Sequence, residues 1–141
     1  MIINFTIEGE PKAKARPKVT KQGFAYTPKD TVNYESWVKQ CYLDRYAGFF
    51  LEGEIKASII AYFSIPKSKS KKIKEKMING DINPTKKPDV DNIAKIILDS
   101  LNGIAYHDDS EIVQCSIKKR YAELPRVEVY LESEGIRQNE N

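Results

Sequence analysis

Two aspartates, Asp89 and Asp91, stand two residues apart at the start of a segment whose apolar residues recur at helical spacing. Like charges this close repel each other unless a cation or a proton relieves the repulsion, although the dipole of a helix N-terminus offsets part of it. Lys95 follows Asp91 by four residues, so a helix would place both on one face, where they can form an ion pair. Asp99 continues this face one turn later. The segment is therefore a candidate for chemistry that uses carboxylates and a lysine.

A second acidic pair, Asp108 and Asp109, follows directly after His107. If folding brought the two pairs together, they would form an oxygen-rich pocket suited to Mg²⁺, which prefers carboxylates and water as ligands. Phosphodiester hydrolysis uses such a pocket to activate a water and position the phosphate, and Lys95 could stabilise the developing charge or hold that water. Structural interpretations stay open, with Asp89 as a helix N-cap and the later pair and the histidine in a surface turn.

Other chemistries lack their motifs. The sequence contains no Gly-rich phosphate loop, no GxSxG and no HExxH, and it does not match a calcium-binding EF-hand loop. His107 is the single histidine, so any Ser-His-Asp or Cys-His mechanism would have to use it. Cys41 and Cys115 lack the spacing of a zinc site or a disulfide framework, and we expect both to be small buried residues in a reducing cytoplasm.

The composition indicates one globular domain. The chain has 141 residues, of which 40% are hydrophobic and 30% charged, which excludes a largely disordered protein. Its longest apolar stretch is far shorter than a membrane span, and its N-terminus has no basic region typical of a signal peptide. We therefore expect a cytoplasmic protein that does not contact membranes.

The net charge of +3 conceals an uneven distribution. The segment Lys12–Lys29 contains six basic residues and no acidic one, and Lys67–Lys87 contains eight basic and two acidic residues. The remainder is therefore acidic. Two basic segments on an acidic body favour a polyanionic partner, although lysine-rich runs are often only solvated surface.

The apolar pattern predicts an α+β domain with a mixed or mostly antiparallel sheet packed with two main helices. We expect residues 1–132 to form this domain and residues 133–141 to be a polar, flexible tail. Alternation predicts strands at residues 3–7, 55–65, 113–117 and 127–131, with the last two joined as an antiparallel hairpin through Leu124-Pro125. Residues 9–23 are expected to form a polar loop.

Helical spacing predicts three helices. The first begins at Thr27-Pro28 and runs to about Tyr46, the second spans residues 68–79, and the third begins at Asp89. Gly80 and Asn102-Gly103 are expected to end the second and third helices. In the first helix we expect an apolar stripe that belongs to the core: Tyr34, Trp37, Val38, Cys41 and Tyr42.

The acidic segment resembles the RusA family of Holliday junction resolvases. The family pattern D-x-D-N-x-x-K, then D-x-L, then a D-D pair before a strand matches residues 89–95, 99–101 and 108–109. Residues 9–17 and 26–28 also look like the N-terminal part of such proteins. The resemblance spans roughly residues 3–131, and its specific motifs lie in the second half.

The resemblance implies a homodimeric endonuclease that depends on Mg²⁺, with Mn²⁺ as a candidate substitute, and that needs no organic cofactor. Such an enzyme binds four-way DNA junctions and nicks two opposed strands symmetrically during recombination and repair. Family members are often encoded by phages and prophages, so the resemblance implies a bacterial or phage origin.

The resemblance also assigns roles by position. Asp89, Asp91 and Asp109 correspond to the catalytic carboxylates that bind the metal, and Lys95 corresponds to the catalytic lysine. Asp108 is a further candidate metal ligand. Asp99 matches an acidic position that supports the site.

The DNA-binding residues are predicted from the basic segments. The candidates are Lys14, Arg16, Lys86 and Lys87, of which the last two immediately precede the acidic motif. Two alternative functions stay open. The chain could be a non-catalytic protein that binds DNA or junctions and uses its acidic cluster structurally, or a metal-dependent phosphoesterase with a different substrate.

Overall fold

A four-stranded mixed sheet forms the centre of the fold. The computed structural model describes residues 1–13, 18–26 and 29–138. The strands β1 (Ile2–Glu8), β4 (Phe49–Ser64), β5 (Ile112–Ala122) and β6 (Arg126–Gln138) lie in the order β1-β6-β4-β5. β6 is antiparallel to both of its neighbours, whereas β4 and β5 are parallel. The α+β class with a mixed sheet is therefore confirmed.

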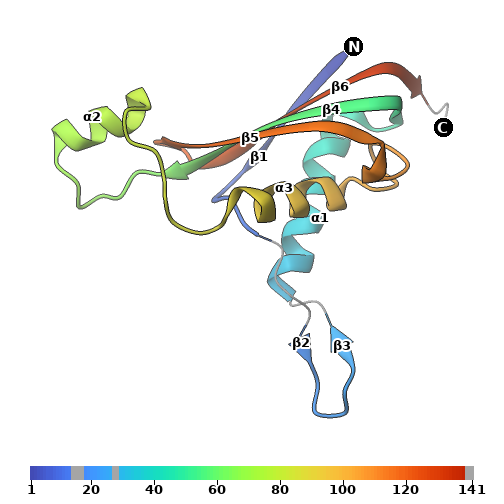
Figure 1. Ribbon diagram of the computed structural model, residues 1–141, viewed down its shortest axis with the longest axis horizontal. Helices are drawn as coiled ribbons and strands as arrows, with labels where there is room; N and C mark the ends of the chain where they lie inside the picture. The colour runs from blue at the N-terminus through green and yellow to red at the C-terminus, as the bar shows by residue number, and fades with distance from the viewer. Residues whose placement is uncertain (14–17, 27–28, 139–141) are drawn as a thin grey trace.

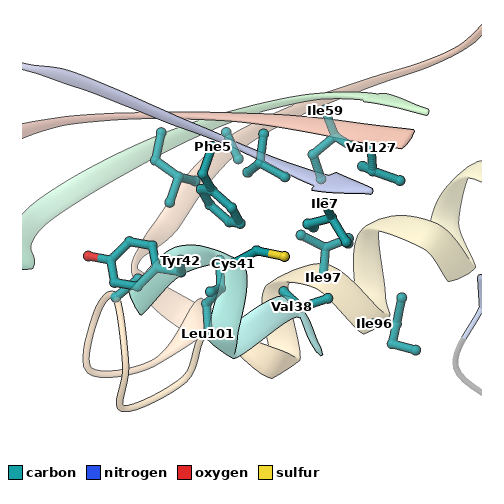
Figure 2. Close-up of a cluster of buried hydrophobic side chains, with 14 of the residues drawn as sticks. Phe5, Ile7, Val38, Cys41, Tyr42, Ile59, Ile96, Ile97, Leu101 and Val127 are labelled. Atoms are coloured by element: carbon teal, nitrogen blue, oxygen red, sulfur yellow. The ribbon is translucent and has the colours of Figure 1, made fainter. Parts of the chain in front are cut away.

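Two helices, α1 (Lys29–Tyr46) and α3 (Val90–Ser100), cover one face of this sheet (Figure 1). The core lies between the sheet and these helices, because alternate residues of the strands point toward the helices. Figure 2 shows strand residues facing apolar side chains of both helices, among them Phe5, Ile7, Ile59 and Val127 opposite Val38, Tyr42, Ile96 and Ile97. Phe5 and Tyr42 also pack edge to face, with ring centroids 5.6 Å apart.

The apolar stripe of α1 is confirmed except at one residue. Tyr34, Val38, Cys41 and Tyr42 are buried, but Trp37 is 42% exposed. The indole of Trp37 lies at the edge of the core, where its Nε1 donates a hydrogen bond to the Glu8 carbonyl at 2.9 Å. The expected start of this helix at Thr27-Pro28 falls outside the described residues.

The predicted hairpin between β5 and β6 is wrong. The two strands follow each other in sequence, but β4 lies between them and pairs with both. β5 is parallel to β4, and parallel neighbours require a long crossover connection. The chain from residue 65 to residue 111 provides it and includes α3.

The C-terminal strand is longer than the sequence predicts. β6 extends to Gln138, and its residues 135–138 pair with residues 49–52 of β4. Ile136 packs against the core, which explains why the strand continues through a segment that is otherwise polar. Of the expected tail, residues 139–141 fall outside the described part.

The second helix, α2 (Lys71–Asn79), lies beyond one end of the sheet (Figure 1). The Ser70 hydroxyl caps it by accepting a hydrogen bond from the Ile73 amide, and Gly80 ends it in the left-handed conformation, as predicted. Met77 is its only buried residue. By contrast, α3 ends with Leu101 as its C-cap, one residue before the predicted Asn102-Gly103.

A small hairpin, β2 (Lys18–Val19) and β3 (Ala25–Tyr26), begins within the predicted polar loop and ends just beyond it, and it projects away from the sheet (Figure 1). Its turn carries Phe24, which is 71% exposed. Cys115 is also exposed, contrary to expectation, because it lies on the edge strand β5. None of the helices in the described part of the chain has the length and apolar character needed to cross a membrane.

Candidate active site

The N-terminus of α3 presents Asp89 to solvent. Ile93 anchors this end of the helix in the core, and its amide donates to the Asp89 carbonyl at 3.0 Å. Asp89 therefore occupies the N-cap position, as the structural interpretation predicted. Its carboxylate, however, makes no capping hydrogen bond. The carboxylate of Asp89 is therefore not occupied by capping the helix.

Asp91 and Lys95 are exposed one helical turn apart. They are close enough in sequence to pair, but the structure shows no ion pair between them. Neither side chain makes a hydrogen bond or an ion pair with any residue in the described part of the chain. The anticipated pair is therefore not formed, and no other residue in the described part of the chain neutralises either charge.

Asp108 has a structural partner. It is the N-cap of a single 3₁₀ turn, Asp109–Glu111, and its carboxylate accepts a hydrogen bond from the Ser110 amide at 3.1 Å. In return, the Glu111 side chain accepts from the Asp108 amide at 3.1 Å. The hydrogen bonds from Ser110 lower the pKa of Asp108. This capping role favours Asp109, rather than Asp108, as the residue of the pair that meets a ligand.

Asp109 lies beside Asp99, which comes from the last turn of α3. Burial, a hydrogen bond with Asp99 and the negative charges of Asp99 and Asp108 all raise the pKa of Asp109. A hydrogen bond between two carboxyl groups requires a proton on one of them. The pair therefore holds a proton, or another cation, more readily than a lone carboxylate would.

Tyr106 is fully buried and lies close enough to these carboxylates to interact with their charges. Its hydroxyl donates to the Leu98 carbonyl at 2.6 Å, which ties the loop after α3 back onto that helix. Burial raises the pKa of Tyr106, and the charges of Asp109, Asp99 and Asp108 raise it further. Tyr106 thus positions the acidic turn and interacts electrostatically with its carboxylates.

The predicted metal ligands do not form one compact group. Asp91 and Asp99 are eight residues apart, which corresponds to about 12 Å along a helix axis. Among the described residues, no three His, Cys, Asp or Glu side chains are arranged to hold one metal ion. The donor chemistry nevertheless fits Mg²⁺, because every candidate ligand is a carboxylate and the Asp99–Asp109 repulsion is of the kind that a cation relieves.

A cleft of about 360 Å³ opens next to Asp89. Lys12 and Lys87 contribute the positive charge of its lining, Asn92 contributes an amide, and Pro11, Ala13 and Pro88 contribute apolar surface. The predicted DNA-binding residue Lys87 therefore lies beside a predicted catalytic carboxylate.

Of the other predicted DNA-binding residues, only one lies in the described part of the chain. Lys86 is exposed next to the cleft residue Lys87, whereas Lys14 and Arg16 fall outside the described residues. Sequence reasoning did not single out Lys12, although it is the first residue of the N-terminal basic segment. His107 is exposed, as expected of a residue in a surface turn.

Comparison with known proteins identifies the family. A protein of Bacillus subtilis (strain 168), described as "Uncharacterized protein YqaN", is 37% identical over 134 residues, which cover 92% of this chain and 94% of that protein. The sequence model of the family described as "Endodeoxyribonuclease RusA" matches residues 8–132 and so includes α3, the acidic turn and the cleft. The chain therefore belongs to the RusA family of endodeoxyribonucleases.

Proposed function

We propose that this protein is a Mg²⁺-dependent, homodimeric endonuclease that resolves four-way DNA junctions by symmetric paired nicks in the cytoplasm. The observation that carries the proposal is the exposed D-x-D-N-x-x-K motif at the start of α3 in a member of the RusA family. Asp91 and Lys95 have no partner among the described residues, and a cleft with two lysines lies beside Asp89.

Asp89, Asp91 and Asp109 would supply the carboxylate ligands for Mg²⁺, the first two from the start of α3 and Asp109 from the turn that follows its other end. When bound, the ion would supply an activated water and positive charge for the phosphate in the transition state. Lys95 donates its ammonium protons to an oxygen of the scissile phosphate as negative charge develops there. Lys12 and Lys87, which line the cleft, bind the DNA backbone. Asp108 and Tyr106 keep the turn that carries Asp109 in place.

Homodimerisation is proposed because paired nicks require two copies of the site. A four-way junction has two opposed strands of like polarity, and a two-fold symmetric dimer presents the same residues to both. Concerted cutting of the two strands by one dimer would release two duplexes during recombination or repair.

A time course with an end-labelled synthetic four-way junction tests the proposal. The reaction is run with and without Mg²⁺, with excess linear duplex as competitor, and with the Asp91→Asn variant alongside. We expect paired nicks in opposed strands that disappear without the metal and in the variant. Asp44→Asn is the matched control, because it removes the same charge from an exposed site on α1.

Two results would contradict the proposal. Tight junction binding with no cleavage under any divalent metal would indicate a non-catalytic junction-binding protein. Equal cleavage of junction and linear duplex would indicate a metal-dependent phosphoesterase with a different substrate.

A further inference from the structure

Two lysine ammonium groups approach the same aromatic ring at one end of the sheet. The Nζ atom of Lys119, on the edge strand β5, lies 5.1 Å from the centroid of the Phe63 ring, and the Nζ atom of Lys86 lies 5.9 Å from it. Phe63 is only 2% exposed, so packing in the core holds its ring in place. Lys119 also donates a hydrogen bond to the Lys86 carbonyl.

This arrangement leaves positive charge uncompensated. Neither Lys86 nor Lys119 forms an ion pair with a carboxylate in the described part of the chain. A cation over an aromatic ring gains roughly 0.5–1 kcal/mol at an exposed site, but the ring carries no net charge and does not remove the repulsion between two ammonium groups. An anion placed between them would relieve that repulsion and accept hydrogen bonds from both.

The two lysines lie close to the candidate active site along the chain. Lys86 precedes Asp89 by three residues, and three residues span at most about 10 Å. That length corresponds to roughly three nucleotides, at about 3.4 Å per nucleotide along one strand. The hydrogen bond from Lys119 fixes the backbone of this segment against β5, so the distance between the lysines and Asp89 is restrained.

We propose that Lys86 and Lys119, above Phe63, form a binding site for one phosphate of the DNA strand within about three nucleotides of the phosphate that is cut. We name it the Lys86–Lys119 cradle. The inference rests on the proposed function for the identity of the DNA, but the cradle itself needs only a phosphodiester. Lys119 binds the phosphate and also positions the segment that leads to Asp89.

Lys119→Met tests the cradle, with Lys118→Met as the matched control. Lys118 is the preceding residue of β5, is exposed, and points to the opposite face of the sheet. Each variant therefore loses one positive charge, but only Lys119→Met loses it beside Phe63. Methionine keeps an apolar stem over Phe63, which preserves packing. The equilibrium affinity for a four-way junction and for a linear duplex of equal length is measured in EDTA over a series of salt concentrations.

We expect Lys119→Met to weaken DNA binding by roughly 3- to 10-fold and to reduce the slope of log affinity against log salt by about 0.9, as loss of one phosphate contact predicts. Lys118→Met should stay within about two-fold of the unmodified protein with an unchanged slope. Lys86→Met should reproduce the slope of Lys119→Met, and the double variant should lose little more, because both lysines hold the same phosphate.

The cradle is overturned if Lys119→Met and Lys118→Met have the same slope, or if Lys86→Met leaves the slope unchanged. A Lys119→Met protein that cuts more slowly with an unaltered slope would show that Lys119 only positions the chain. If the cradle exists but the proposed function is wrong, the slope differences between the variants will persist on linear duplex, while junction preference and cleavage will be absent. Absence of all DNA binding by the unmodified protein would overturn both.

Discussion

The carboxyl groups of Asp99 and Asp109 meet between the last turn of α3 and the following 3₁₀ turn. The folded chain brings together two groups that would both be charged at neutral pH in the unfolded chain, where the pKa of an aspartate is about 3.8. The pKa of Asp109 is raised in the folded state, so folding favours its protonated form. The contribution of this pair to stability is therefore fully present below about pH 3.8 and is lost as the pH rises through the folded-state pKa.

Asp99→Asn should consequently stabilise the metal-free protein at neutral pH. The variant removes one charge, and its amide can donate a hydrogen bond to Asp109 without a shared proton. We expect Tm at pH 7 to rise by roughly 1–3 °C and the difference to shrink as the pH approaches 4. Thermal unfolding in EDTA at both pH values measures this, and a Tm that falls equally at both would contradict it.

Lys95→Ala should slow cleavage with little effect on binding. The ammonium group of Lys95 acts on charge that develops during the reaction, so its loss should lower the single-turnover rate by about 100-fold or more. The affinity for an uncut junction in EDTA should change by less than about three-fold. Lys56→Ala serves as the control, because Lys56 is exposed on β4 and points away from α3. Equal losses of rate and affinity would show that Lys95 binds DNA in the ground state instead.

Some features of the candidate site could be predicted from the sequence, and others could not. The start of α3 at Asp89 and the exposure of Asp91 and Lys95 follow from local spacing, because a helix fixes the directions of residues four apart. The Asp99–Asp109 contact and the approach of Lys119 to Phe63 depend on how separate elements pack. No local pattern contains that information.

At the scale of elements, α2 is attached to the fold more weakly than α1 or α3. It buries only Met77, and most of its other residues are exposed. Its stability therefore depends on its two ends, where Ser70 and Gly80 supply the caps. A helix of this kind should open locally without unfolding the rest of the domain.

Ser70→Ala should increase this local opening. Loss of an N-cap side chain costs about 1 kcal/mol, so the amide hydrogen exchange of residues 71–79 should accelerate roughly five-fold. The exchange of α3 amides should not change. Ser68→Ala is the control because Ser68 precedes the cap and is exposed. Equal acceleration in both variants would show that Ser70 does not stabilise α2 by capping.

The elements themselves were largely predictable, but their partners were not. The strands and helices were located from the period of their apolar residues, and the end of α2 from Gly80. The start of α2 was placed at residue 68, so its N-cap Ser70 was not predicted. The hairpin between β5 and β6 was inferred because the two strands are neighbours in sequence. Strand pairing is decided by all available edges, and β4 pairs along both of its edges in the fold. The length of β4, which is 16 residues, was also underestimated, because the strict alternation of apolar residues begins only at Ile55.

At the scale of the whole molecule, stability should depend strongly on the interior of β6. Leu131 is fully buried in the core, whereas Leu124, in the connection before β6, is 75% exposed. We expect Leu131→Ala to reduce the free energy of unfolding by about 2–5 kcal/mol through lost burial and a residual cavity. Leu124→Ala should change it by less than about 0.5 kcal/mol. Urea denaturation of both variants measures the difference, and similar losses would place the core elsewhere.

The central position of β6 also governs how the newly made chain can fold. β1 is made before the other strands, yet among the described strands it pairs only with β6, and the Met1 amine donates a hydrogen bond to the Ser133 carbonyl 132 residues later. At about 5–20 residues per second, the apolar side of β1 must wait roughly 6–25 s for its partner. During synthesis, the apolar side of the first strand therefore stays exposed, and it becomes part of the protein's interior only when β6 has been made.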